Sequence, residues 1–134
     1  IARAAGELGV SYTLVTGIAS NDTFIENVLS TPESVLCTKK FERIEAVFSG
    51  AGETLSAALA ALIATGLDLS VAASEALHYL DRCLDEGFRP GMGHVIPDRL
   101  FWALPETEEG EEGDEGGPDM NADFFEMPIN ETKH

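Results

Sequence analysis

Two hydrophobic patterns follow one another at the start of the chain and predict a helix and then a strand. Apolar residues recur at helical spacing from Ile1 to Leu8, which predicts the end of an amphipathic helix over residues 1–9. Residues 11–16 are rich in β-branched and aromatic types and nearly continuous in apolar character, as is typical of a buried strand in a parallel sheet. Helix, short turn and buried strand together form one step of an α/β fold.

A β-hairpin is predicted next. Residues 17–22 have loop composition, whereas residues 24–29 and 34–38 have strand composition. The turn between these two strands contains Pro32, whose fixed φ suits a turn position. A third extended segment over residues 41–48 then leads into a glycine-rich loop.

Two helices are predicted after this loop. The first covers residues 53–65, where alanine is abundant, and Gly66 is well placed to end it. Its many small side chains indicate close packing against a sheet. The second runs from an N-cap at Ser70 to about residue 86 and carries charges away from its apolar stripe. This stripe comprises Ala73, Leu77, Leu80 and Leu84. Residues 88–104 are predicted to be mostly irregular.

The acidic charge of the chain is concentrated in its last part. The net charge is −16, of which residues 1–104 carry −6, from 13 acidic and 7 basic residues. Residues 105–134 carry −10, from 11 acidic residues and Lys133, and show no apolar period. We therefore expect one domain over residues 1–104 followed by a disordered tail. Neither part has the basic face that nucleic-acid binding requires, so nucleic acid is not an expected partner.

The two cysteines and the hydropathy pattern bear on the compartment. Cys37 and Cys83 lie 46 positions apart without a second cysteine or histidine beside either, which argues against a disulfide framework or a zinc site. No apolar run reaches the roughly 18 residues that a membrane span needs. We therefore expect a cytoplasmic protein with no membrane partner. Because the chain begins inside a helical pattern at Ile1, we also expect further protein upstream.

The segment Gly50-Ala51-Gly52-Glu53 is the most informative part of the sequence, because it lies between an extended segment and a helix. A helix N-terminus presents unpaired N–H groups with a partial positive charge, and glycines let an anion approach the backbone closely. Such a loop suits a transferring phosphoryl group, and a carboxylate in the first turn suits a general base. Taken alone, the pattern also fits a glycine turn followed by a favourable acidic first turn.

In its wider setting the sequence resembles the ribokinase superfamily, and within it the hydroxymethylpyrimidine (phosphate) kinases and the pyridoxal kinases. The specific string is SGAGETLSAALAAL over residues 49–62. LVTG over residues 14–17 and ALHYLDRCLDEGFRPGMGHV over residues 76–95 reinforce it. The resemblance covers roughly residues 1–103. It implies the C-terminal part of a ribokinase-like three-layer α/β/α fold with a mostly parallel sheet.

The resemblance also assigns roles to the loop residues. It implies that Gly50, Ala51 and Gly52 form an anion hole and that Glu53 is the catalytic base. Such kinases carry Gly-Thr-Gly-Asp or Gly-Thr-Gly-Cys here, so Ala51 lacks a hydroxyl donor and Glu53 is one methylene longer than aspartate. Misplacement of a catalytic group by about 1 Å costs on the order of 100-fold in rate.

Two further assignments come from the resemblance. Thr16 and Gly17 are expected in the nucleotide phosphate region, although a strand ending in an ordinary turn is an equally good interpretation of these two residues. The segment Gly91-x-Gly93-His94 resembles the end of the pyrimidine kinases, which favours that activity over pyridoxal kinase; His94 itself is expected to serve packing or hydrogen bonding.

The expected function is ATP-dependent phosphorylation of hydroxymethylpyrimidine or its monophosphate in thiamine biosynthesis, with Mg²⁺ as the metal cofactor. The alternatives are a pyridoxal or pyridoxine kinase of vitamin B6 salvage and a catalytically impaired nucleotide-binding homologue. The expected partners are ATP and a small vitamin precursor, and homodimer formation is left open. The Asn-x-x-Glu pattern that helps to hold magnesium in these kinases is absent from this sequence and is expected upstream, so no metal ligand is assigned.

Overall fold

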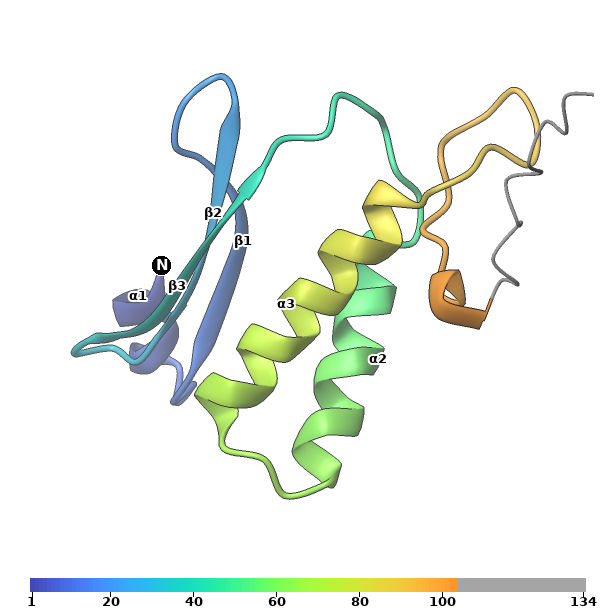
Figure 1. Ribbon diagram of the computed structural model, residues 1–134. Coiled ribbons are helices and arrows are strands. Elements are labelled where there is room, and N and C mark those ends of the chain that lie inside the picture. Colours follow the sequence, from blue (N-terminus) through green and yellow to red (C-terminus); the bar gives the residue numbers. More distant parts are fainter. Residues whose placement is uncertain (104–134) are drawn as a thin grey trace, which may run out of the picture. The chain divides into compact units, whose positions relative to one another are not determined.

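The computed structural model of this protein describes residues 1–103, which contain a three-stranded antiparallel sheet. A short helix, α1 (Ala2–Glu7), precedes the strands. The strands are β1 (Thr13–Ala19), β2 (Phe24–Ser30) and β3 (Val35–Glu42), and they lie side by side in the order β1-β2-β3 (Figure 1). The mixed helix-and-strand architecture agrees with the prediction. The parallel part of the predicted sheet stays a prediction, because the described strands pair antiparallel.

The predicted hairpin is confirmed as β2 and β3, which are joined by a turn in which the Thr31 hydroxyl accepts a hydrogen bond from the Ser34 N–H at 3.1 Å. The third extended segment was only partly right. Its first two residues continue β3, and only Phe48 near its end pairs again, in a parallel bridge with Val95.

The predicted loop over residues 17–22 was wrong at its start, because β1 continues through Ala19 and forms a second hairpin with β2. Gly17 has a φ of 70°, and the pairing register shifts between Val15 and Ile18. The side-chain oxygen of the buried Asn27 accepts a hydrogen bond from the Gly17 N–H at 3.0 Å and so replaces a ladder partner. This glycine makes a bulge inside the strand, whereas we predicted that it would end the strand.

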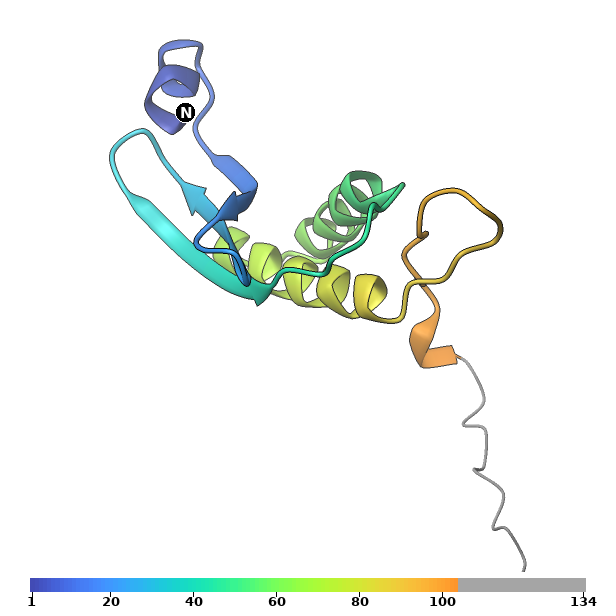
Figure 2. The same cartoon turned by 90° about the horizontal axis from the view of Figure 1, so that it is seen from above.

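Helices α2 (Ala51–Ala64) and α3 (Leu69–Asp85) lie together on one face of the sheet (Figure 2). The predicted start of the first helix was two residues late, because Gly50 caps it. The predicted cap of the second helix was also wrong: the Asp68 side chain accepts a hydrogen bond from the Ser70 N–H at 2.9 Å, so Asp68 is the N-cap. Gly66 follows the last turn of α2 with a φ of 88°, as predicted.

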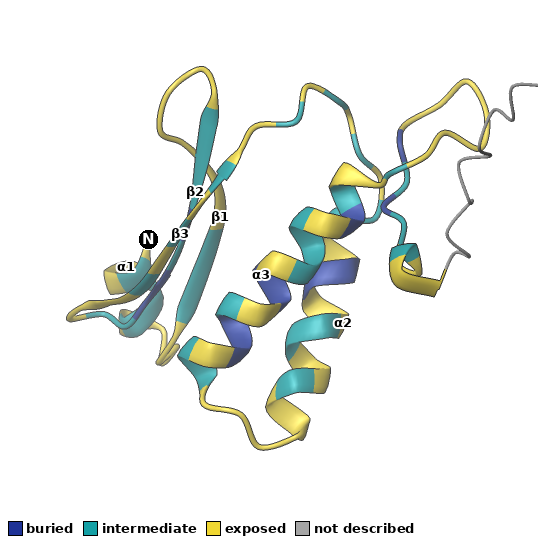
Figure 3. Ribbon diagram, viewed as in Figure 1, coloured by how far each residue is buried: buried dark blue, intermediate teal, exposed yellow. Residues whose placement is uncertain are grey.

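The core lies where α2, α3 and the sheet meet. Leu55, Ala76 and Leu77 form a buried cluster, against which Leu14 and Phe41 of the sheet pack. Figure 3 shows the buried positions of α3 on the side that faces its neighbours, and they include the predicted Ala73 and Leu77. Three fully buried alanines in α3 let the backbones approach closely. These alanines are Ala72, Ala73 and Ala76. Small side chains were expected to mark close packing in the first helix, but the alanines of α2 are exposed or only partly buried, so the close packing lies in α3 instead.

The chain after α3 returns to the segment that precedes α2. The Ser49 N–H donates to the Val95 carbonyl at 2.9 Å, and the Val95 N–H donates to the Val47 carbonyl at 2.9 Å. A short 3-10 helix, η1 (Phe101–Ala103), ends the described part. No helix within residues 1–103 is both long enough and apolar enough to cross a membrane. The predicted tail over residues 105–134 lies outside the described residues, so the proposed domain boundary stays a prediction.

Candidate functional site

The glycine loop forms the N-terminus of α2. Gly50 is the N-cap residue in the left-handed region, with a φ of 92° and a ψ of 8°, and no side chain in the described part of the chain caps the helix by a hydrogen bond. Ala51, Gly52 and Glu53 occupy the first turn. The N–H groups at the start of a helix point out of its end and carry a partial positive charge. The structure therefore brings the four predicted loop residues together at an end of the helix that suits an anion.

The two glycines of the loop have different steric environments. A Cβ atom on Gly50 would lie 2.9 Å from the Nη2 atom of Arg99, and its positive φ disfavours any side chain. A Cβ atom on Gly52 would meet no atom of residues 1–103 within 4 Å. Gly50 is thus required by the fold of this chain, whereas the space beside Gly52 is free for a ligand.

Glu53 lies at the edge of a groove between α2 and α3. Its side chain is exposed, and the groove is also lined by Glu75, Tyr79 and Arg99. The next residue, Thr54, is buried, with 4% of its surface exposed. Solvent access to Glu53, together with its place in the first turn, leaves its carboxylate free to accept a proton from a group bound near the loop.

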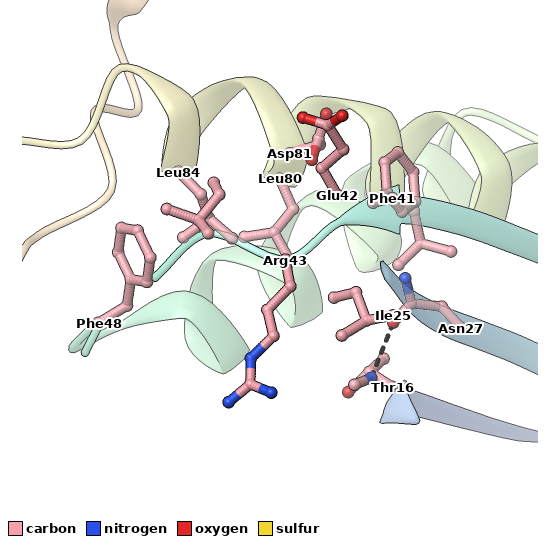
Figure 4. A pocket seen from close by; sticks show the side chains of 13 residues that line it. Thr16, Ile25, Asn27, Phe41, Glu42, Arg43, Phe48, Leu80, Asp81 and Leu84 are labelled. Atoms are coloured by element: carbon pink, nitrogen blue, oxygen red, sulfur yellow. Dashed lines mark hydrogen bonds between the residues drawn. The ribbon is translucent and has the colours of Figure 1, made fainter. Parts of the chain in front are cut away.

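A cavity of about 220 Å³ lies between the sheet and α3. The predicted nucleotide residues Thr16 and Gly17 line it together with apolar side chains of the sheet and of α3, and Figure 4 shows Thr16 among them. These apolar residues are Ile25, Phe41, Leu77, Leu80 and Leu84. Phe48 also lines the cavity and precedes Gly50 by two residues in the sequence.

Charged side chains border this cavity on opposite sides. In Figure 4 the guanidinium of Arg43 extends away from the carboxylates of Glu42 and Asp81. Burial raises the pKa of Asp81 above its ordinary value, and the negative charge of Asp85 raises it further, while His78 lowers it. The cavity thus has one cationic side, which favours phosphate, and one acidic side.

His94 and its neighbours lie beside the glycine loop. Gly91, Gly93 and His94 line a shallow depression together with Ser49. The backbone pairing between Phe88 and Ile96 closes this segment into a loop, with hydrogen bonds of 3.0 and 2.8 Å. His94 is exposed. The predicted packing role of His94 stays a prediction.

Several residues that shape the site were missed by the sequence interpretation. Asn27 and Arg43 line the cavity, while Thr54 and Arg99 are joined by a hydrogen bond of 2.8 Å behind the loop. Thr54 carries a weak local signal, because a threonine in a first helical turn often bonds the carbonyl four residues earlier. Arg99 has none, since its partner is 45 residues away in the sequence.

The resemblance implies Mg²⁺ as a cofactor, and a magnesium site draws on oxygen ligands such as carboxylates. Residues 1–103 contain no group of three or more His, Cys, Asp or Glu side chains that could hold a metal ion. Because Mg²⁺ is commonly held by one or two carboxylates together with substrate phosphates, the expected magnesium motif upstream stays a prediction.

Comparison with known proteins gives a family match and several similar folds. The family model described as phosphomethylpyrimidine kinase matches residues 1–98. An ADP complex of Bacillus subtilis pyridoxal kinase has a TM-score of 0.64 and 24% identity, over 78% of this chain and 39% of that one. Pyridoxal kinase from Staphylococcus aureus in complex with AMP-PCP has a TM-score of 0.66 and 17% identity, over 73% of this chain and 36% of that one.

A third solved structure, pyridoxal kinase from Entamoeba histolytica, has a TM-score of 0.60 and 27% identity, over 73% of this chain and 34% of that one. This chain therefore spans about two-fifths or less of the length of each of these kinases. No curated protein matches it.

Replacing the two loop glycines tests their different roles. Gly50→Ala is expected to lower the free energy of unfolding by about 1–2 kcal/mol, because alanine is strained at a left-handed φ. Gly52→Ala is expected to leave this free energy unchanged or to raise it by up to about 1 kcal/mol, because alanine favours the helix. Urea denaturation followed by circular dichroism measures both values. Equal destabilisation by the two substitutions would contradict this assignment.

The raised pKa of Asp81 predicts a pH-dependent effect of its removal. Since the folded state holds this proton more tightly than the unfolded state, the ionised carboxylate opposes folding. Asp81→Asn should therefore raise the melting temperature at neutral pH. The gain should shrink as the pH falls through the raised pKa and vanish below the ordinary aspartate value of about 3.9. Asp22→Asn on an exposed loop is the matched control, and a gain at Asp81 that is independent of pH would contradict the interpretation.

Proposed function

Because the chain belongs to the phosphomethylpyrimidine kinase family, we propose that it contributes to the transfer of the γ-phosphoryl group of ATP to hydroxymethylpyrimidine or its monophosphate, in thiamine biosynthesis. The resemblance to vitamin kinases of the ribokinase superfamily that the sequence predicted is confirmed. The observation that carries the proposal is the N-terminus of α2, where the N-cap Gly50 provides no side-chain hydrogen bond to the first N–H groups. Gly50, Ala51 and Gly52 all lie inside the matched region.

The nucleotide fits the cavity between the sheet and α3. Apolar side chains such as Phe41, Leu80 and Leu84 suit the flat face of adenine, and the polar atoms at Thr16 and Gly17 suit its ribose or phosphates. From there the phosphate chain would follow Phe48 toward the glycine loop. The solved pyridoxal kinases with similar folds include complexes with ADP and with AMP-PCP, which supports a nucleotide in this fold.

Phosphoryl transfer needs positioning and charge stabilisation more than covalent chemistry from the protein. The N–H groups of Ala51 and Gly52 would hold the oxygens of the transferring group at the positive end of α2. With hydroxymethylpyrimidine as the acceptor, Glu53 would accept the proton of the attacking hydroxyl, whose oxygen then bonds to the γ-phosphorus. With the monophosphate as the acceptor, an oxygen of its phosphate group would form this bond instead. In both cases the bond from the γ-phosphorus to the bridging oxygen breaks to release ADP.

The two departures from the family pattern fit this scheme without a change of mechanism. Ala51 lacks a hydroxyl, but its backbone N–H is retained and is not blocked by a capping side chain. Glu53 is longer than aspartate, and its exposed position leaves the extra methylene room to adjust. Magnesium would neutralise the phosphates in the complete site. We assign it no ligand within residues 1–103.

Two alternatives remain open to test. Pyridoxal is favoured as a substrate by one observation, since the similar solved structures are pyridoxal kinases. Initial rates of the whole encoded protein on hydroxymethylpyrimidine, its monophosphate and pyridoxal decide between the two substrate classes. Equal or faster turnover of pyridoxal would reverse our ranking.

The second alternative is a nucleotide-binding homologue without kinase activity, which the departures from the family pattern at Ala51 and Glu53 suggest. ATP binding without any phosphoryl transfer would identify it.

Substitution of Glu53 tests the proposed base. Glu53→Gln should lower kcat at least about 100-fold, because an amide cannot take the proton, while ATP affinity stays close to that of the wild type. Glu75→Gln is a matched control, since Glu75 lines the same groove on α3. Steady-state kinetics and ATP titration measure the two quantities. Undiminished turnover of the Glu53 variant would remove this residue from the mechanism.

A further inference from the structure

A chain of hydrogen bonds connects Arg99 to the glycine loop. The Nε–H of Arg99 donates to the Thr54 hydroxyl at 2.8 Å, and that hydroxyl donates to the Gly50 carbonyl at 2.7 Å. The Thr54 N–H donates to the same carbonyl at 3.0 Å. With 4% of its surface exposed, Thr54 is shielded from competing water. The hydroxyl therefore uses both its accepting and its donating capacity to link the arginine to the loop.

The geometry of the peptide bond makes the Gly50 carbonyl important for the anion site. The Gly50 carbonyl and the Ala51 N–H belong to one planar trans peptide, so they point in opposite directions. With the carbonyl held toward Thr54 inside the helix, the Ala51 N–H must point out of the helix end. Any rotation of this peptide would turn the N–H away from a bound anion. The bond from Thr54 thus fixes the direction of a proposed phosphate donor.

Arg99 is itself held in place by α3. The Tyr79 hydroxyl donates to the Arg99 carbonyl at 2.9 Å, and the preceding Asp98 N–H donates to the Cys83 carbonyl at 2.8 Å. The Nη2 atom of Arg99 lies 2.9 Å from the position that a Cβ on Gly50 would take, so the guanidinium packs directly against the loop. Arg99 therefore connects α3 to the start of α2.

We propose that Arg99 is a positioning residue of the phosphoryl-transfer site. Through the Thr54 hydroxyl, it fixes the Gly50–Ala51 peptide so that the Ala51 N–H faces the transferring phosphoryl group. This inference rests on the proposed function. Because Arg99 acts through Thr54, its loss should lower kcat more than it weakens ATP binding.

The test compares turnover of single and double variants in the whole encoded protein. Arg99→Met keeps the length of the side chain without its donors, and Thr54→Val keeps the shape without the hydroxyl. Each should lower kcat about 10-fold or more, with the KM for ATP within about twofold of the wild type. Both substitutions break the same relay of hydrogen bonds from Arg99 through Thr54 to Gly50. The kcat of the double variant should therefore be no more than about twofold below that of the worse single variant.

Two further variants separate positioning from general damage to the fold. Thr54→Ser retains the hydroxyl and should keep kcat within about threefold of the wild type, although it loses a methyl group. Arg3→Met on α1 is the matched control for an arginine far from the loop and should leave kcat unchanged. Wild-type turnover in Thr54→Val or in Arg99→Met would overturn the proposal, as would effects that multiply fully in the double variant.

A second measurement is independent of turnover. In ¹H–¹⁵N NMR spectra the Ala51 amide signal should shift in Arg99→Met and in Thr54→Val, and stay in place in Arg3→Met. An unmoved Ala51 signal in Arg99→Met would overturn the relay whether or not the protein is active. A wild type without kinase activity but with these shifts would instead refute the proposed function and leave the relay supported.

Discussion

The left-handed conformation of Gly50 is the constraint on which the site depends. At this residue the chain passes from the bridge at Phe48 into α2, and a φ of 92° lets the first turn begin at once. Because glycine has no side chain to accept their hydrogen bonds, the first N–H groups of the helix stay free for a ligand. A side chain at this position would be strained and would meet Arg99. This turn thus creates the helix end that we propose as the anion site.

Contacts with other segments of the described structure fix the position of this turn. Ser49 is bonded to Val95, so the segment after α3 fixes the approach to the turn. The alanines of α3 allow close packing within the core, and α3 in turn anchors Arg99 through Tyr79. The position of a few backbone atoms at residue 50 therefore depends on contacts with segments more than 40 residues away. Catalysis by electrostatic preorganisation requires this kind of fixed geometry.

Local patterns in the sequence predicted the elements well and their limits less well. Helix periodicity located both long helices, and the Pro32 turn located the hairpin of β2 and β3. Gly17 was misread as the end of a strand, because a glycine bulge is stabilised by the distant side chain of Asn27. Ser70 was misread as a cap because Asp68 competes for the same role. The loop at residues 50–53 was recognised from its setting, whereas Thr54 and Arg99 required the tertiary structure.

A crystal structure of the whole encoded protein with AMP-PCP would show whether phosphate binds at the start of α2. We expect the terminal phosphate oxygens about 3 Å from the N atoms of Ala51 and Gly52, with adenine packed against Leu80 and Leu84. A nucleotide bound elsewhere, with these two N–H groups facing only water, would contradict this expectation.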